Sequence, residues 1–309
     1  MELVKLKPAV KDYIWGGKYF QSFGKGQNLE RVSECWELSL RPEGPSLIAS
    51  GKNTGKKLSD VIKNPDIGPI MFGLNGFPLL IKLIDAKENL SVQVHPDDVY
   101  ALENEGDYGK SEMWHIISAD EGCGLYVGLK KDYTKEDIEK ALKKGDILDY
   151  LNFFEVKPGE TYVINPGTIH AIGKGVRLIE IQENSNVTYR LYDYNRVDKD
   201  GNPRELHIEK ALEVIDYHKY QRSHSKGELL VDNQYFTVKR VAFNGSLRIT
   251  ANDRAFKSFT FLEGQGTVDN IPFQQYDTFF LPYSLDCVIK GEGVVIVSTV
   301  KQKEYEESF

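Results

Sequence analysis

The 309-residue chain is poor in cysteine and has no long hydrophobic run. Its three cysteines, Cys35, Cys123 and Cys287, are far apart and odd in number. This pattern indicates free thiols in a reducing compartment rather than a disulfide framework. No segment approaches the ~18 apolar residues of a membrane span, and the N-terminus lacks the apolar core of a signal peptide. We therefore expect a cytoplasmic protein that does not act on a membrane.

The chain also lacks an excess of positive charge and any glycine-rich phosphate loop. Its formal net charge is −7 and its pI is near 5.5. A broad basic surface of the kind that binds nucleic acid is therefore not expected. Without a loop that offers backbone N–H groups, an anionic ligand must be bound by a few local basic side chains.

Short alternating or apolar runs separated by Gly, Pro and Asn or Asp dominate the sequence, which predicts a mainly β protein. Helix patterns are fewer, and they lie near 57–64, 134–152 and 203–217. The second of these begins with Thr134 three residues before Asp137, as in a capping box. The clearest strand patterns are "PLLIKLIDA", "SVQVH", "MWHIISA", "GLYVGL", "ETYVIN", "VRLIEIQ" and "VTYRLYDY".

A polar stretch after Tyr217, "HKYQRSHSKGE", is the best candidate for a linker between two domains. It divides the chain into 1–225 and 226–309. In the second part "FNGSLRI" predicts a hairpin. The segments "GETYVINPGTIH" (159–170) and "YDTFFLPYSLD" (276–286) share a polar start, an apolar strand and a proline turn. This weak repeat indicates two related β-barrels, of which only the first carries a histidine after the turn.

Candidate metal ligands occur in three separate segments. In "NLSVQVHPDD" (89–98) apolar and polar residues alternate, so Ser91, Gln93 and His95 share one face of a strand. "GKSEMWHII" adds Glu112, and "INPGTIHAIG" adds His170. Imidazole and carboxylate suit zinc and related divalent ions, and an amide oxygen is an unusual but permitted ligand. Taken singly, each histidine is better explained as a core or surface side chain, and Glu112 as a solvated charge.

The other histidines are interpreted as structural or surface residues. His115 is out of phase with Glu112 in a strand and should face the other way. The remaining three lie in or near the polar connection between the two halves: His207, His218 and His224.

Four segments together resemble type I phosphomannose isomerases of the short bacterial form. They are "PLLIKLIDAKENLSVQVHPDD", "GKSEMWHII", "NPGTIHAIG" and "IEIQENSNVTYRLYDYNR". The resemblance covers about residues 8–210 and is looser in the C-terminal part. It implies two cupin-like jelly-roll barrels with a small helical insertion, and an enzyme that interconverts mannose 6-phosphate and fructose 6-phosphate.

The resemblance also implies one zinc ion per chain and a set of site residues. The metal ligands would be Gln93, His95, Glu112 and His170. Lys82, Ser91, Lys110 and Arg190 would bind the substrate, while Arg190, Glu180 and Lys110 would take part in catalysis. Taken alone, Lys82 is explained as a solvated charge and Arg190 as a surface salt bridge. Arg196 and Lys87 are likewise interpreted as surface charges. The general base and the cation that faces phosphate stay open, with Glu180 the leading base.

The resulting hypothesis is a zinc-dependent aldose–ketose isomerase that works by proton transfer through an enediolate. Its small-molecule partner is a sugar phosphate, and the oligomeric state is open. The main alternative is a sugar-phosphate-binding cupin without turnover. An oxygenase cupin is disfavoured because its ligands are usually richer in histidine. The region after residue 226 is expected to carry neither metal nor catalytic groups, because no histidine follows His224.

Overall fold

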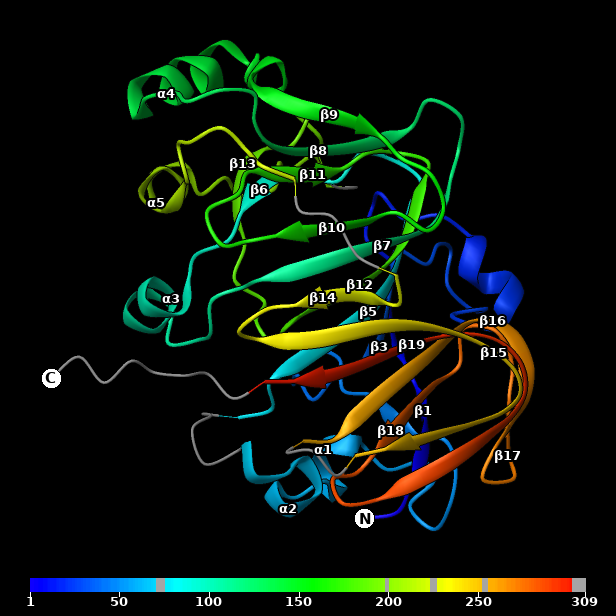
Figure 1. The fold of residues 1–309 in the computed structure, drawn as a ribbon. Helices are drawn as coiled ribbons and strands as arrows, with labels where there is room; N and C mark the ends of the chain where they lie inside the picture. Colours follow the sequence, from blue (N-terminus) through cyan, green and yellow to red (C-terminus); the bar gives the residue numbers. More distant parts are fainter. Residues whose placement is uncertain (71–75, 198–199, 223–226, 252–254, 302–309) are drawn as a thin grey trace, which may run out of the picture. The chain divides into compact units, whose positions relative to one another are not determined.

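The computed structural model describes residues 1–70, 76–197, 200–222, 227–251 and 255–301. The contacts between residues group the chain into two compact units. The first comprises residues 1–10, 35–82 and 225–309, and the second comprises 11–34 and 83–224. The first unit thus combines two N-terminal segments with the C-terminal segment. The mainly β fold expected from the sequence is confirmed (Figure 1).

The elements of the second unit alternate between short strands and a few helices. They are the 3-10 helix η1 (Tyr19–Phe23), β6 (Val92–Val94), α3 (Asp98–Asn104), β7 (Glu112–Ala119), β8 (Gly124–Leu129), α4 (Lys135–Lys144), the 3-10 helix η3 (Ile147–Tyr150), β9 (Leu151–Glu155), β10 (Thr161–Ile164), β11 (His170–Ile172), β12 (Val176–Glu183), β13 (Tyr189–Tyr192) and α5 (Ile208–Val214). The chain crosses between units within β2 (Ala9–Lys11), β3 (Glu34–Leu38) and β5 (Leu79–Ala86).

Two antiparallel sheets pack face to face in the second unit. One contains β10, β7 and β12 in that order, and the other has the order β13-β6-β11-β8-β9. Side chains from both sheets form a shared core that includes Trp114, Tyr162 and Leu178 from the first, and Val127 and Ile172 from the second. Period-two alternation therefore places one set of apolar residues between the sheets.

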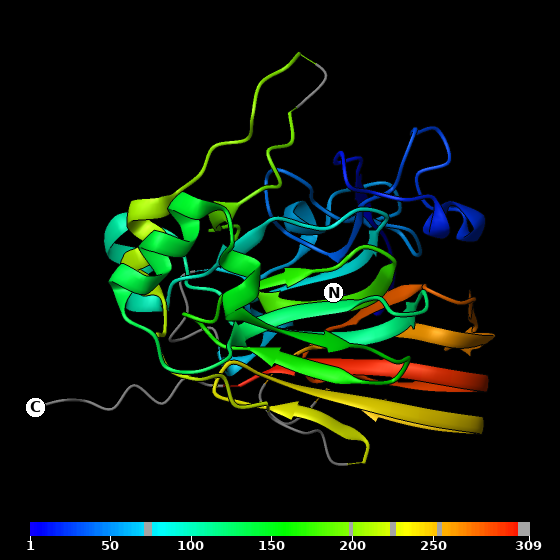
Figure 2. The same cartoon turned by 90° about the horizontal axis from the view of Figure 1, so that it is seen from above.

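Helices α4 and α5 cover the other face of the five-stranded sheet. Ile138 and Ala141 of α4 and Leu212 of α5 pack with Val92 and Leu191 of the sheet. Figures 1 and 2 show α3, α4 and α5 on the same side of this unit. Because helices cover this face, the residues that the strands present to it are apolar.

The expected helices are present but shorter than the sequence pattern indicated. The side chain of Thr134 accepts a hydrogen bond from the N–H of Asp137, so the capping box that opens α4 is confirmed. Gly145 ends this helix in the left-handed conformation, and the apolar pattern continues as η3 and β9. Of the segment near 203–217 only Ile208–Val214 is helical, and in 57–64 the helix is Leu58–Val61, with a second helix beginning at Asn64.

The first unit contains one large antiparallel sheet. Its elements are β1 (Val4–Lys7), β4 (Leu47–Ile48), α1 (Leu58–Val61), α2 (Asn64–Ile67), β14 (Leu229–Asp232), β15 (Phe236–Thr250), β16 (Lys257–Val268), β17 (Ile271–Phe273), β18 (Thr278–Leu281) and β19 (Asp286–Val300). The sheet order is β14-β15-β19-β16-β18-β1-β4, with β17 paired to β16. Phenylalanines dominate its core, as in the stacked pair Phe261 and Phe273, whose ring centroids are 3.6 Å apart.

The hairpin predicted at "FNGSLRI" is wrong. These residues lie inside β15, which pairs with β19 without interruption from Phe236 to Thr250. Gly245 has φ +106° and lies opposite Gly291, so the Asn-Gly pair occupies a position of unusual backbone conformation within a long strand. Glycine in a strand often marks such a site rather than a chain reversal.

Candidate metal centre and active site

Three neighbouring strands of the second unit place polar residues in one row. In β6, Gln93 pairs with His170 of β11 on one side and with Arg190 of β13 on the other. Residues directly opposite each other in adjacent antiparallel strands project from the same face of the sheet. The row therefore brings together side chains from sequence positions 93, 170 and 190.

A second row comes from the facing sheet. Glu112 and Trp114 are two residues apart in β7 and so share one face. They lie opposite Gln182 and Glu180 of β12, respectively. The side chains of Glu112, Trp114 and Glu180 are all buried. The two rows meet at His170, whose ring lies edge-on to the indole of Trp114 at a centroid distance of 5.3 Å.

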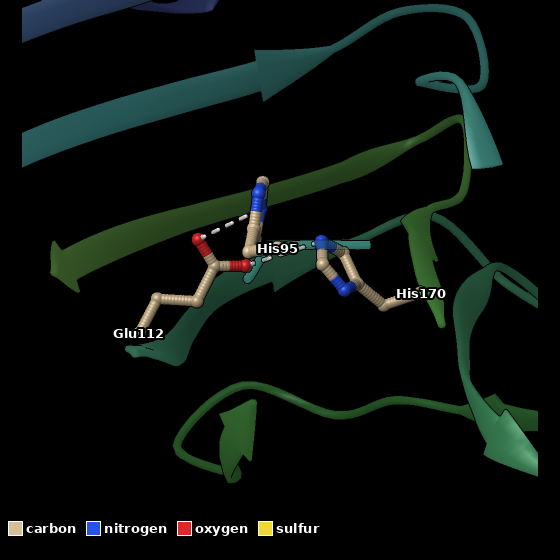
Figure 3. Close-up of side chains that lie close together, drawn as sticks. All are labelled: His95, Glu112 and His170. Carbon is tan, nitrogen blue, oxygen red and sulfur yellow. Dashed lines mark ion pairs between the residues drawn. The ribbon is translucent and has the colours of Figure 1, made fainter. Parts of the chain in front are cut away.

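His95, Glu112 and His170 form a compact group of potential metal ligands (Figure 3). His95 Nε2 lies 3.7 Å from Glu112 Oε2, and His170 Nε2 lies 3.3 Å from Glu112 Oε1. One ligand atom from each residue lies within 4.8 Å of the others. All three side chains are at most 1% exposed.

Hydrogen bonds to backbone carbonyls set the direction of both imidazoles. His95 Nδ1 lies 2.8 Å from the carbonyl oxygen of Val187, and His170 Nδ1 lies 2.8 Å from that of Thr168. A carbonyl only accepts, so each Nδ1 carries the proton and each Nε2 faces Glu112. Such second contacts are typical of histidines that bind metals.

The ligand group suits a divalent cation. Burial lowers the pKa of His170 to about 4, so this imidazole is neutral at pH 7. Its Nε2 lone pair then faces a carboxylate oxygen, which is also an acceptor. A cation placed between these atoms converts repulsion between acceptors into coordination by nitrogen and oxygen, as in zinc sites.

Lys110 is the cation nearest to the ligand carboxylate. Its Nζ lies 2.9 Å from Glu112 Oε2, and the residue is only 5% exposed. The charge of Lys110 also contributes to the low pKa of His170, after the larger effect of burial. Lys110 thus lies beside the group of potential ligands, where the family resemblance implied a residue that binds substrate and takes part in catalysis.

Gln93 and Ser91 connect the ligand group to Arg190. Gln93 Nε2 is 3.3 Å from His170 Nε2, and Ser91 Oγ donates to Gln93 Oε1 over 3.3 Å. Arg190 Nε donates to Ser91 Oγ over 3.3 Å. The oxygen and nitrogen of an amide are assigned from such contacts, so a half-turn of the amide would present its oxygen to the ligand group instead.

Arg190 is half-buried and anchored at two points. Besides Ser91, its Nη1 donates to the carbonyl oxygen of Glu205 over 2.7 Å. Burial, and then the nearby charge of Arg204, lower the pKa of Arg190. Its contacts thus join Arg190 to Ser91 beside the ligand group and to the backbone at Glu205.

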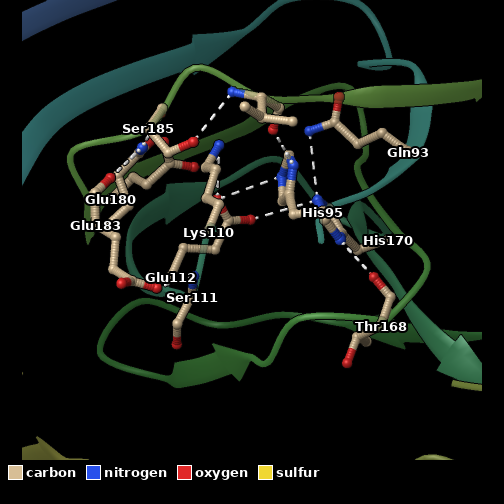
Figure 4. Close-up of polar contacts among 12 residues, drawn as sticks. Gln93, His95, Lys110, Ser111, Glu112, Thr168, His170, Glu180, Glu183 and Ser185 are labelled. Atoms are coloured by element: carbon tan, nitrogen blue, oxygen red, sulfur yellow. Dashed lines mark hydrogen bonds and ion pairs between the residues drawn. The ribbon is translucent and has the colours of Figure 1, made fainter. Parts of the chain in front are cut away.

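Glu180 accepts a hydrogen bond from the indole N–H of Trp114, with 2.8 Å between Nε1 and Oε2. The carboxylate is 3% exposed and close enough to His170 to oppose the lowering of its pKa. Glu180 therefore lies in the neighbourhood of the ligand group (Figure 4). Lys82 belongs to the first unit, where it is buried and its ammonium lies 5.6 Å from the ring centroid of Trp36.

The other histidines that the structure describes lie outside the ligand group. His115 is buried and bonds Thr161 Oγ1 over 2.9 Å, on the face opposite to Glu112, as its phase predicted. His207 accepts from the backbone N–H of Arg190, and His218 is exposed beside Asp216. His224 lies outside the described residues.

A polar cluster around Asp193 was missed by sequence reasoning. Arg204 donates to both carboxylate oxygens, and Arg196, assigned to the surface, also contacts this carboxylate. Burial acts to raise the pKa of Asp193, but hydrogen bonds from the two arginines bring it below its usual value. Only their clustering in "YDYNRVDKDGNPR" could have indicated this pairing.

The fold and the ligand group together define a cupin-like metal protein. Comparison with known proteins narrows this class. Residues 3–115 match the family model described as "Phosphomannose isomerase type I, catalytic domain". The chain is 35% identical to the mannose-6-phosphate isomerase ManA of Bacillus subtilis, over 94% of this chain and 97% of that protein. It is 33% identical to the mannose-6-phosphate isomerase of Streptococcus mutans, over 95% of this chain and 92% of the relative.

A solved structure agrees with these sequence relatives. The crystal structure of the mannose 6-phosphate isomerase from Bacillus subtilis superimposes with a TM-score of 0.86 at 35% identity. The match covers 96% of this chain and 99% of the other. The chain belongs to the type I phosphomannose isomerase family.

Proposed function

We propose that this chain is a zinc-dependent mannose-6-phosphate isomerase, which interconverts mannose 6-phosphate and fructose 6-phosphate. The observation that carries the proposal is the buried group of His95, Glu112 and His170, in a chain that matches isomerases along nearly their whole length. A sugar phosphate is then the small-molecule partner. In the part of the chain that the structure describes, no helix is long and apolar enough to span a membrane. A cytoplasmic location remains part of this proposal.

One zinc ion per chain would be held by His95, Glu112, His170 and the amide oxygen of Gln93. The donor set fits because three acceptor groups converge in a buried site and both histidines are oriented by carbonyls. Such an ion, once bound, supplies a Lewis acid that stabilises negative charge developing on sugar oxygens.

The chain's own residues supply binding and proton transfer. Lys82, Lys110, Ser91 and Arg190 bind the sugar phosphate, and Arg190 and Lys110 offer positive charge to its anionic oxygens. Glu180 takes the proton from C2 of mannose 6-phosphate and returns it to C1, through an enediolate. The hydrogen bond from Trp114 fixes the direction of the Glu180 carboxylate for this transfer.

The residues after 226 serve a supporting role in this proposal. In this proposal they form a domain without metal ligands or catalytic groups, and residues 1–225 form the catalytic domain. Their strands in the first unit bury a phenylalanine-rich core. We expect removal of residues 228–309 to leave insoluble or unstable protein, because that apolar surface would lose its partner.

A coupled assay of fructose 6-phosphate formation from mannose 6-phosphate tests the function. Turnover should disappear after chelation and return with one equivalent of zinc. Tight binding of mannose 6-phosphate without turnover, at full metal occupancy, would favour the alternative of a sugar-phosphate-binding cupin.

A further inference from the structure

The segment of residues 182–187, at the end of β12, contacts the strands that carry two of the metal ligands. Figure 4 shows Glu183 and Ser185 of this segment beside Ser111 and the ligand group. Apart from the carbonyl of Val187, which orients His95, this segment takes no part in the roles derived above. Its contacts nevertheless lead directly to His95 and to Glu112.

The segment is held in one conformation by its own side chains. Gln182 Nε2 donates to the carbonyl oxygens of Glu183 and Ser185, each over 2.7 Å. Ser185 Oγ donates to the carbonyl of Tyr108 over 2.7 Å and accepts from the N–H of Val187 over 3.2 Å. Ser185 is fully buried. Its hydroxyl therefore acts as donor and acceptor at once, which joins the N–H of Val187 to the carbonyl of Tyr108.

The first contact with the site passes through Val187 to His95. The carbonyl oxygen of Val187 lies 2.8 Å from His95 Nδ1. Because the Ser185 hydroxyl binds the N–H of Val187, it limits where this residue lies. A fixed carbonyl holds the proton of His95 on Nδ1 and aims Nε2 at the ligand group.

The second contact passes through Glu183 to Glu112. Glu183 Oε2 accepts from the backbone N–H of Ser111 over 2.8 Å, and the N–H of Glu183 donates to the carbonyl of Ser111 over 3.1 Å. Ser111 directly precedes Glu112. Both backbone groups of the residue before the ligand are therefore fixed by Glu183.

We propose that Ser185 and Glu183 are positioning residues for the metal centre: through Val187 and Ser111 they hold His95 and Glu112 in the geometry that binds the ion. The proposal rests on the metal site put forward above. Outer contacts of this kind typically account for 10- to 100-fold in metal affinity. A residue that served folding alone would lower stability without such a change.

Ser185→Ala with a matched control tests the proposal on the full-length chain. The control is Ser258→Ala, since Ser258 is equally buried and its Oγ donates to the carbonyl of Phe279 over 3.0 Å. Zinc affinity is measured by competition with a chelating indicator, and the stability of both metal-free variants by thermal unfolding. We expect Ser185→Ala to weaken zinc binding by about 10- to 100-fold and Ser258→Ala to leave it at the wild-type value.

A pair of variants at Glu183 keeps the test decisive if Ser185→Ala does not fold. Glu183→Gln retains an oxygen that can accept from Ser111 and should bind zinc as the wild type does, whereas Glu183→Ala should bind it more weakly. Wild-type zinc affinity in folded Ser185→Ala, or in Glu183→Ala, would overturn the proposal. The isomerase assay of the wild-type chain decides the proposed function separately, since zinc affinity requires no turnover.

Discussion

Substitution of Arg190 tests whether its guanidinium binds the negative charge of the substrate. Its Nε and Nη1 donate to Ser91 Oγ and to the carbonyl oxygen of Glu205. Two anchors from a planar group fix the direction of the remaining N–H donors on Nη2. Arg190→Lys keeps the charge but replaces the planar fork by a single ammonium, which cannot make both contacts and also face a substrate anion in the same geometry.

The expected loss follows from these contacts. A hydrogen bond to a charged group contributes about 1.5–3 kcal/mol, so failure to align one such donor in the transition state costs near the upper part of this range. We expect kcat/KM for mannose 6-phosphate to fall at least ~100-fold, which corresponds to about 2.7 kcal/mol of transition-state stabilisation. The melting temperature should change little, because the ammonium can retain one of the two anchors.

The assay compares kcat/KM and thermal unfolding of this variant with those of Arg248→Lys. Arg248 is an exposed arginine of the first unit that pairs with Asp286, so the same change there leaves the site intact. Wild-type kinetics in Arg190→Lys would refute the argument and return Arg190 to a structural role. A large fall in melting temperature that matched the loss of activity would do the same.

Three further predictions concern the metal, an acid-sensitive contact and the first unit. His170→Ala should lose bound metal and activity together, measured by elemental analysis and turnover, whereas the exposed His218→Ala should keep both. Because its two arginine partners lower the pKa of Asp193, this carboxylate stabilises the fold at neutral pH, and the contribution is lost as the pH falls below about 4. Asp193→Asn should therefore lower the free energy of unfolding by about 3 kcal/mol at pH 7. The stability of this variant should also fall less steeply than that of the wild type as the pH is lowered, and urea unfolding at a series of pH values measures both effects. Gly264→Ala should cost more stability than Gly245→Ala without changing metal content, because a Cβ at Gly264 would lie 1.9 Å from a facing carbonyl oxygen, while at Gly245 it meets nothing within 4 Å.

Local patterns in the sequence were sufficient for most elements of the second unit but not for the long strands of the first. The alternation in "SVQVH" and the capping box at Thr134 are properties of neighbouring residues, and the structure contains both. The local sequence around the Asn-Gly pair at Gly245 does not distinguish a hairpin from a continuous strand. Pairing with β19, which lies some fifty residues later, decides between them. Long-range pairing of this kind overrides local turn preference.

The ligands could be predicted from local sequence patterns, but the groups that orient them could not. A ligand must be a particular residue type on a particular face, so strand phase could relate Gln93 to His95 and exclude His115. The atoms that orient the two ligand histidines are backbone carbonyls, and every residue has one. Residue type therefore carries no signal for them, and neither Thr168 nor Val187 could be singled out beforehand. What the sequence can encode is the side chain that fixes such a carbonyl, as the hydroxyl of Ser185 does through its contact with Val187. For that reason the orienting groups of this metal centre became visible only once the strands were placed side by side.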